Sequence, residues 1–185
     1  MRKELPEIVR ADEWAPLVIR TDYTDDAAWG EVVAALACAV EGERDWEAAV
    51  HFVEDRRWDG GTGEEALAAA ARDEELSVVF LADEVTMRSP LRPLLARDLG
   101  ADDDEDLDPV YYQELMDSLP PREVRVVPDA VHMVHGNLQL ANVDFPEFVE
   151  EAVADPDGVV RDLVTEPGEP GDGVAGNSYA GGPLR

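Results

Sequence analysis

Three aspartates follow an apolar run near the start of the chain, and their side chains could bind a metal ion. The segment PLVIRTDYTDD contains Asp22, Asp25 and Asp26. Carboxylate oxygens are ligands that Mg²⁺ prefers, and bound Mg²⁺ often acts on phosphate substrates. The alternative is structural, because acidic side chains in the first turn of a helix interact favourably with its dipole. If Thr24 caps such a helix, Asp25 and Asp26 are explained and only Asp22 remains open.

Asp22, Asp83 and Asp98 each lie at the end of a segment that is predicted to be a strand. In a parallel sheet the carboxyl ends of the strands meet at one edge, where ligands bind. The three carboxylates could therefore hold Mg²⁺ in an enzyme that hydrolyses or transfers a phosphoryl group. Two features weaken this hypothesis. The GGTG segment at 60–63 lacks the spacing and the lysine of a P-loop, and the chain has no lysine after Lys3 to hold a phosphate.

A second group of polar residues lies within the otherwise apolar segment NLQLANVDF. Asn137 and Asn142 could form turns, since asparagine tolerates left-handed backbone. They could also form a recognition patch together with Arg20 and Asp22. The two interpretations differ in whether these side chains share a cleft or bond to their own backbone.

Histidine and cysteine give no complete metal or nucleophile site. His132 and His135 form an H-x-x-H pair, but zinc needs more ligands, and the remaining histidine, His51, lies in a predicted strand. Cys38 is expected to be a buried thiol, because it lies among alanines and valines of a predicted helix. We therefore predict no structural metal and no bound cofactor.

The composition is strongly acidic. Asp and Glu number 43 against 15 Lys and Arg, and the formal net charge is -28. Direct binding to a nucleic-acid backbone needs clustered positive charge, so this chain would be repelled. Three interpretations remain: adaptation for solubility or salt, a docking surface for a basic protein partner, or mimicry of nucleic acid.

The length of 185 residues suits one domain that needs no disulfide for its stability. No apolar stretch approaches the roughly 20 residues needed to cross a membrane. The first residues, MRKELPEIVRADEW, lack the apolar region of a secretory signal. We therefore expect a cytoplasmic protein that does not insert into a membrane.

Apolar runs alternate with segments of helical periodicity along the chain. A run such as SVVFLAD, apolar at consecutive positions, is typical of a strand buried on both faces. This alternation favours an α/β fold, a single-domain sandwich with a largely parallel or mixed sheet of about five strands flanked by helices. We expect strands near 17–19, 48–55, 77–83, 93–99 and 123–127, and helices near 25–40, 64–73 and 145–153.

Three segments of the second half are harder to assign. A short helix is predicted at 110–120, a helical turn at 128–135, and a strand at 138–142, where apolar and polar residues alternate. Asp144 is predicted to cap the last helix, with Glu147 three residues later.

The ends of the chain differ from its middle. Residues 1–13 are charged and without periodicity, which indicates a flexible N-terminal arm. Residues 14–164 are expected to form the single α/β domain. Residues 165–185 are rich in Gly and Pro, which predicts a disordered tail.

Several motifs resemble an uncharacterised actinobacterial family of small proteins, a domain of unknown function. They are PLVIRTDYTDDAAW at 16–29, VRVVP at 124–128, NLQLANVDFPEF at 137–148 and DGVVRDL at 157–163. The resemblance implies one folded unit over residues 16–163 and carries no activity.

Two hypotheses about function remain. The first is an acidic, cytoplasmic, protein-binding domain without catalytic activity, which docks onto a basic partner or neutralises it like an immunity protein. The alternative is a Mg²⁺-dependent phosphate-processing enzyme with Asp22, Asp83 and Asp98 as its carboxylates. The second hypothesis requires these three side chains to lie close together in the fold.

Overall fold

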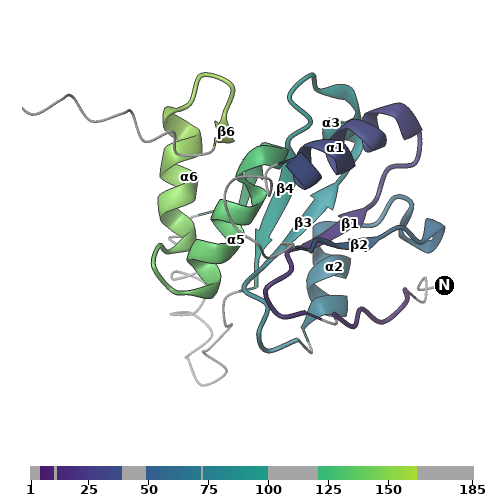
Figure 1. Ribbon diagram of the computed structural model, residues 1–185, viewed down its shortest axis with the longest axis horizontal. Coiled ribbons are helices and arrows are strands. Elements are labelled where there is room, and N and C mark those ends of the chain that lie inside the picture. Colours follow the sequence, from purple (N-terminus) through teal and green to yellow (C-terminus); the bar gives the residue numbers. More distant parts are fainter. Residues whose placement is uncertain (1–4, 11, 39–48, 72, 100–120, 162–185) are drawn as a thin grey trace, which may run out of the picture.

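A six-stranded sheet with helices on both faces forms the centre of the molecule, as the computed structural model of the chain shows (Figure 1). The structure describes residues 5–10, 12–38, 49–71, 73–99 and 121–161. The strands, in sequence order, are β1 (Leu17–Arg20), β2 (His51–Val53), β3 (Val78–Ala82), β4 (Leu94–Asp98), β5 (Glu123–Val126) and β6 (Val159–Val160). The prediction of an α/β fold with a mixed sheet flanked by helices is confirmed, with one strand more than expected.

The order of the strands across the sheet is β2-β1-β3-β4-β5-β6, and β4 alone runs against the others. The carboxyl ends of the other five strands therefore lie at one edge of the sheet, which we call the carboxyl edge. Strand β4 starts at this edge and ends at the opposite one, the amino edge. The register shows this directly, because Asp98 at the end of β4 pairs with Val78 at the start of β3.

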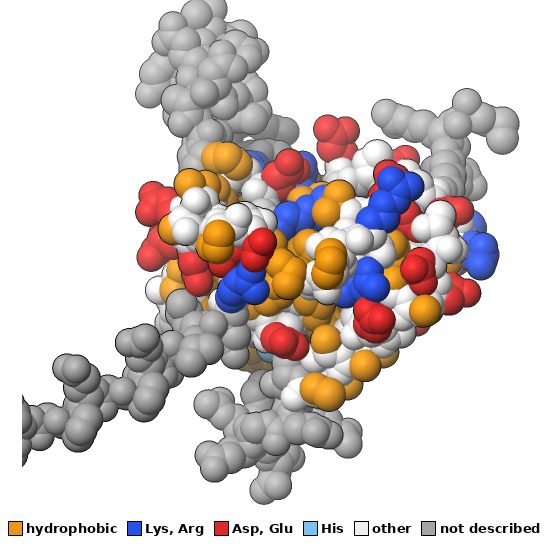
Figure 2. Space-filling view, turned by 90° about the horizontal axis from the view of Figure 1, so that it is seen from above, with side chains coloured by type: hydrophobic (Ala, Val, Ile, Leu, Met, Phe, Trp, Pro, Cys, Tyr) orange, Lys and Arg blue, Asp and Glu red, His pale blue; other side chains and the backbone are white. Residues whose placement is uncertain are grey.

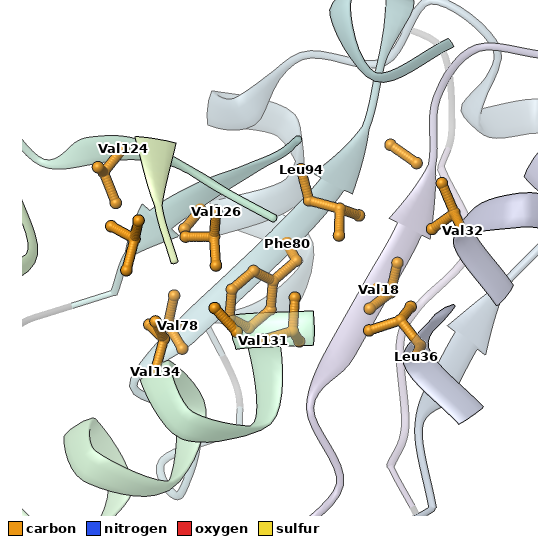
Figure 3. Close-up of a cluster of buried hydrophobic side chains, with 14 of the residues drawn as sticks. Val18, Val32, Leu36, Val78, Phe80, Leu94, Val124, Val126, Val131 and Val134 are labelled. Carbon is orange, nitrogen blue, oxygen red and sulfur yellow. The ribbon is translucent and has the colours of Figure 1, made fainter. Parts of the chain in front are cut away.

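One face of the sheet is covered by α1 (Asp26–Cys38), α3 (Glu84–Arg88), α5 (Val131–Gln139) and α6 (Phe145–Ala154). Side chains at alternate strand positions point into this layer. Figure 3 shows the ring of Phe80 among Val18 from β1, Val126 from β5 and Val131 from α5. All four are fully buried, so this cluster joins the sheet to the helices.

The other face carries a smaller layer, with α2 (Gly63–Ala70), the 3₁₀ turn η1 (Arg56–Trp58) and the N-terminal segment. Its core combines strand side chains that point to this face with residues of α2 and the loops, namely Leu17, Ile19, Val79, Leu81, Trp58, Ala66, Ala70 and Leu76. Strands β1 and β3 are thus buried on both faces, which accounts for their continuous apolar runs.

In the C-terminal half one prediction is wrong and one strand was not predicted. No strand forms at 138–142, because α5 continues to Gln139 and a turn follows in which Ala141 has a φ of 51°. Conversely, Val159 and Val160 form β6 beside β5, and a pair of this length leaves no periodicity to detect. The 3₁₀ turn η2 (Pro128–Ala130) and the start of α5 agree with the helical turn predicted at 128–135.

Cys38 is exposed at the end of α1, so the prediction of a buried thiol is wrong. None of the helices within the described ranges is long and apolar enough to span a membrane. The helix predicted at 110–120 and the tail at 165–185 lie outside the described residues.

Candidate binding site

Arg20 organises the turn between β1 and α1 at the carboxyl edge. Its side chain is only 5% exposed, and Nη2 lies 2.6 Å from Oδ1 of Asp26. Its Nε donates to the backbone oxygen of Asp22 at 3.0 Å. The guanidinium carbon lies 4.4 Å from the ring centroid of Tyr23 and 5.4 Å from that of Trp29. Arg20 therefore connects the turn to the start of the helix.

Asp22, Asp25 and Asp26, which were considered as metal ligands, all form contacts with nearby residues. Asp22 Oδ1 accepts hydrogen bonds from the backbone nitrogen and the hydroxyl of Thr24, at 2.7 and 2.5 Å. Asp25 Oδ1 accepts from the backbone nitrogens of Ala27 and Ala28. Asp25, and not Thr24, therefore caps α1, because Thr24 is already used in the turn of Asp22. The helical interpretation of Asp25 holds with this correction.

Asp83 connects β3, α3 and β5. Its carboxylate accepts a hydrogen bond from the backbone nitrogen of Thr86, and Asp83 thereby caps α3. The same carboxylate forms two contacts of 2.8 Å with the guanidinium of Arg125. Burial by itself would raise the pKa of Asp83. The hydrogen bonds and charge of Arg125, together with Thr86, outweigh burial, so the pKa lies below its ordinary value.

The structure does not bring Asp22, Asp83 and Asp98 together. Asp22 and Asp83 follow β1 and β3 at the carboxyl edge, whereas Asp98 lies at the amino edge beside Val78. The five residues of β3 separate the two positions by about 16 Å. Within the described residues, no group of three or more His, Cys, Asp or Glu side chains is arranged to hold a metal ion.

Asn137 and Asn142 also lie apart from Arg20 and Asp22. Helix α5 starts at the carboxyl edge and runs away from it, so both asparagines are found near its far end (Figure 1). Asn137 Nδ2 donates to the backbone oxygen of Met133, and its own backbone oxygen accepts from the nitrogen of Asn142. These contacts are with the backbone of the same segment, as the turn interpretation expects, but the left-handed residue of the turn is Ala141 and not an asparagine.

Most arginines of the described residues bind carboxylates of the same chain. The ion pairs are Arg10–Asp73, Arg20–Asp26, Arg57–Asp55, Arg88–Glu84, Arg92–Glu31, Arg97–Glu123, Arg122–Asp98, Arg125–Asp83 and Arg161–Asp155. Figure 2, which looks down on the end of the molecule at the top of Figure 1, shows arginine and carboxylate side chains interleaved. Positive charge is thus neutralised internally, and the remaining carboxylates give the surface its acidic character.

A groove of about 450 Å³ at the amino edge gathers several of these carboxylates. It is lined by Arg10, Asp12, Glu13 and Trp14 from the N-terminal segment, and by Asp73 and Glu75 from the turn before β3. We call residues 5–10 and 12–15 the arm, which differs from the predicted arm at 1–13, and this hollow the arm groove. The side chain of Trp14 is 46% exposed, so its ring is accessible beside the carboxylates.

Arg10 is the only cation that lines the arm groove, and it is already neutralised. Its side chain is 2% exposed, with Nε 2.6 Å from Oδ2 of Asp73 and Nη2 3.1 Å from Oδ1. Its Nη1 donates to the backbone oxygens of Glu13 and Ala15, both at 2.9 Å. The hydrogen bonds between the Arg10 guanidinium and the carboxylate of Asp73 hold the pKa of Asp73 below its ordinary value. The other three carboxylates leave the groove with an excess of negative charge.

A larger cavity of about 720 Å³ lies between α2 and the amino ends of β3 and β5. Apolar side chains such as Leu67 and Leu76 form one wall, and Arg97, Arg122 and Asp98 contribute charges of both signs. Asp73 and Glu74 also line it, and Arg97, Arg122 and Asp73 are already paired with Glu123, Asp98 and Arg10.

Sequence reasoning missed the arm groove. Arg10 and Asp73 are 63 positions apart, and no local pattern connects them. The only signal was the short run Asp12, Glu13, Trp14, which places an aromatic residue directly after two carboxylates.

Comparison with known proteins identifies a family and no activity. A family model described as a domain of unknown function, DUF6924, matches residues 15–163. Comparison with curated proteins and with solved structures finds no match.

Proposed function

The chain belongs to the DUF6924 family, a domain of unknown function, and we propose that it is a protein-binding domain that docks onto a basic partner through the arm groove. One observation carries this proposal. Four carboxylates and an exposed indole line a single groove, and the only arginine there is buried against Asp73. Such a groove suits a lysine or arginine side chain of a partner protein.

The chemistry of the groove matches a cationic side chain in two ways. A guanidinium or ammonium group would form charge-assisted hydrogen bonds with Glu13 and Glu75, which are both exposed. Its charge would also be attracted to the face of the Trp14 ring, a contact that contributes about 0.5 to 1 kcal/mol at an exposed site. The acidic surface would steer a basic partner toward the groove and make association sensitive to salt.

Mg²⁺-dependent phosphate chemistry has less support. It requires Asp98 beside Asp22 and Asp83, but Asp98 lies at the other edge of the sheet. Asp83 is bound to Arg125, and Asp22 is occupied by Thr24. The proposed role is therefore binding, without catalysis by these carboxylates.

A short arginine-rich peptide is a suitable probe for the groove. When this peptide is added at low salt and the amide signals of the protein are followed by NMR, we expect those of Trp14 and Glu75 to shift first. The double change Glu13→Gln with Glu75→Gln removes two groove charges, and it should weaken binding about tenfold, whereas Trp14→Ala should weaken it by a factor of about 2 to 5. The matched control is Glu54→Gln with Glu150→Gln, two exposed residues outside the groove.

The comparison with the control decides the result. The control double variant should bind the peptide within about twofold of the wild type. Equal weakening by both pairs would show a diffuse attraction to the whole surface and would count against the groove. The wild type and the groove variant can then serve as paired baits, and a genuine partner should be captured by the wild type alone.

A further inference from the structure

The arm groove exists only while the arm is docked. Four of its six lining residues, Arg10, Asp12, Glu13 and Trp14, belong to the arm, and the other two lie in the turn before β3. If the arm leaves, most of the groove leaves with it. Any group that controls arm docking therefore controls the groove.

Apolar packing and an ion pair hold the arm in place. Leu5 and Ile8 pack, partly buried, against the second core cluster. Arg10 supplies the main polar contact, because its guanidinium binds both carboxylate oxygens of Asp73. Two further bonds from Arg10, to the oxygens of Glu13 and Ala15, shape the arm itself.

Two histidines lie near Arg10 of the arm. His135 of α5 is 2% exposed and lies near Arg10, His132 and the backbone of Glu13 and Trp14. Among the described residues neither of its ring nitrogens makes a hydrogen bond of normal geometry. His51 of β2 lies near Arg10 and Asp73.

Positive charge on either histidine would oppose docking. Burial lowers the pKa of His135 to about 4, and the charges of Arg10 and His132 add to this effect, while the nearby backbone of Glu13 and Trp14 acts in the opposite sense but does not outweigh it. Burial and Arg10 lower the pKa of His51 as well, while Asp73 acts in the opposite sense. Both imidazoles therefore bind a proton less readily while the arm is docked. A proton on either one would place a second positive charge near the Arg10 guanidinium, and at His135, which is buried, the low dielectric constant strengthens the repulsion.

We propose that the arm is a latch. The groove is assembled while the arm is docked, and positive charge on His135 and His51 opposes docking and so favours the unassembled form. The inference rests on the proposed function for its purpose, because the groove is the site that the latch would control. The latch itself is a property of the arm and can be measured without a partner. Acidification should open the arm before the sheet unfolds.

Hydrogen exchange of the full chain, corrected for the intrinsic effect of pH, tests the latch. From pH 7 to pH 4.5 we expect amide protection within the arm to fall by about tenfold or more, since protonation is linked to undocking. Protection of β3 should persist over the same range. With Arg10→Gln the arm should exchange rapidly at both pH values.

Replacing the histidines should remove the response. His135→Gln combined with His51→Gln keeps both sites uncharged, so arm protection should change by less than about threefold between the two pH values. If the double variant fails to fold, His51→Gln alone should still reduce the response. Arm protection that persists at pH 4.5, or that is lost together with the protection of β3, would overturn the latch.

Titration with the arginine-rich peptide at both pH values separates this inference from the proposed function. An arm that opens at pH 4.5, with no peptide binding at either pH, would uphold the latch and contradict the proposed function. If the peptide binds at pH 7 and the arm stays docked at pH 4.5, the latch is contradicted and the proposed function is not.

Discussion

Arg20 places a buried charge at the edge of the sheet where α/β proteins usually bind ligands. A binding role would require its guanidinium to remain available, yet it already contacts Asp22 and Asp26 and stacks on Tyr23 and Trp29. Its donors and its aromatic contacts are therefore used to fix the turn before α1. At this position the chain uses a charged residue for structure.

Replacing Arg20 should lower stability and not merely remove a charge. We expect Arg20→Gln to reduce the free energy of unfolding by about 2 kcal/mol, because ring stacking and buried packing are lost together with the hydrogen bonds. Chemical denaturation measures this directly.

Asp26→Asn is the matched control for Arg20. Asp26 is 77% exposed and asparagine keeps the accepting oxygen, so the expected loss is below about 1 kcal/mol. Unchanged stability of Arg20→Gln would contradict the structural role and reopen a binding role for this residue.

Local roles of single residues could be predicted from the sequence, whereas long-range partners could not. The acidic start of α1 follows from residue types within one turn, and only the identity of the cap, Asp25 in place of Thr24, needed the structure. The partner of Arg10 could not be found, because Asp73 becomes its neighbour only after the sheet has formed.

At the scale of elements, Asp83 and Arg125 tie β3, α3 and β5 together across the start of β4. The ion pair is about three-quarters buried on both sides, with side-chain exposures of 25% and 24%. The guanidinium of Arg125 also lies 3.4 Å from the backbone oxygen of Pro93. These contacts connect strands that are not adjacent in the sheet, so their loss should affect the whole carboxyl edge.

The ion pair should make stability depend on pH in the acid range. The folded pKa of Asp83 lies below its ordinary value, so the unfolded chain binds a proton more readily. The stabilisation is therefore complete above about pH 4 and is lost as the pH falls through the folded pKa. Asp83→Asn should cost about 1 to 2 kcal/mol at pH 7 and progressively less toward pH 2.5.

Urea unfolding of the wild type and Asp83→Asn at several pH values tests this dependence. Glu84→Gln is the control, because Glu84 starts the same helix but is exposed and pairs with the exposed Arg88. A stability difference that stays constant from pH 7 to pH 2.5 would show that the charge of Asp83 contributes nothing.

The direction of β4 explains why the three-aspartate hypothesis fails geometrically. The sequence pattern identified the strand at nearly its correct bounds, but such a pattern does not indicate the direction of a strand within the sheet. The connection from β3 to β4 contains only α3, with five residues, and is short for the crossover that two parallel strands require. The length of this connection was the available signal for an antiparallel pair, and it places Asp98 at the amino edge.

At the scale of the whole molecule, the net charge of -28 acts on stability and on binding in opposite ways. The ion pairs neutralise most of the described arginines, so the remaining interaction among surface charges is repulsive. Repulsion among like charges destabilises the compact state, while the same charges attract a basic partner. Salt screens both effects, since the Debye length falls from about 30 Å at 0.01 M to about 3 Å at 1 M.

Added salt should therefore stabilise the fold and weaken the docking of a basic peptide. From about 0.01 M to about 0.5 M NaCl we expect the thermal midpoint to rise, while the affinity for the arginine-rich peptide falls. Thermal unfolding and calorimetric titration over the same salt series measure the two trends.

Neutralising the groove with Glu13→Gln and Glu75→Gln should flatten the salt dependence of binding more than that of stability, because two of many surface charges contribute little to the total repulsion. A thermal midpoint that falls with salt would mean that attraction within the ion pairs outweighs the repulsion among the remaining carboxylates, and it would contradict this prediction.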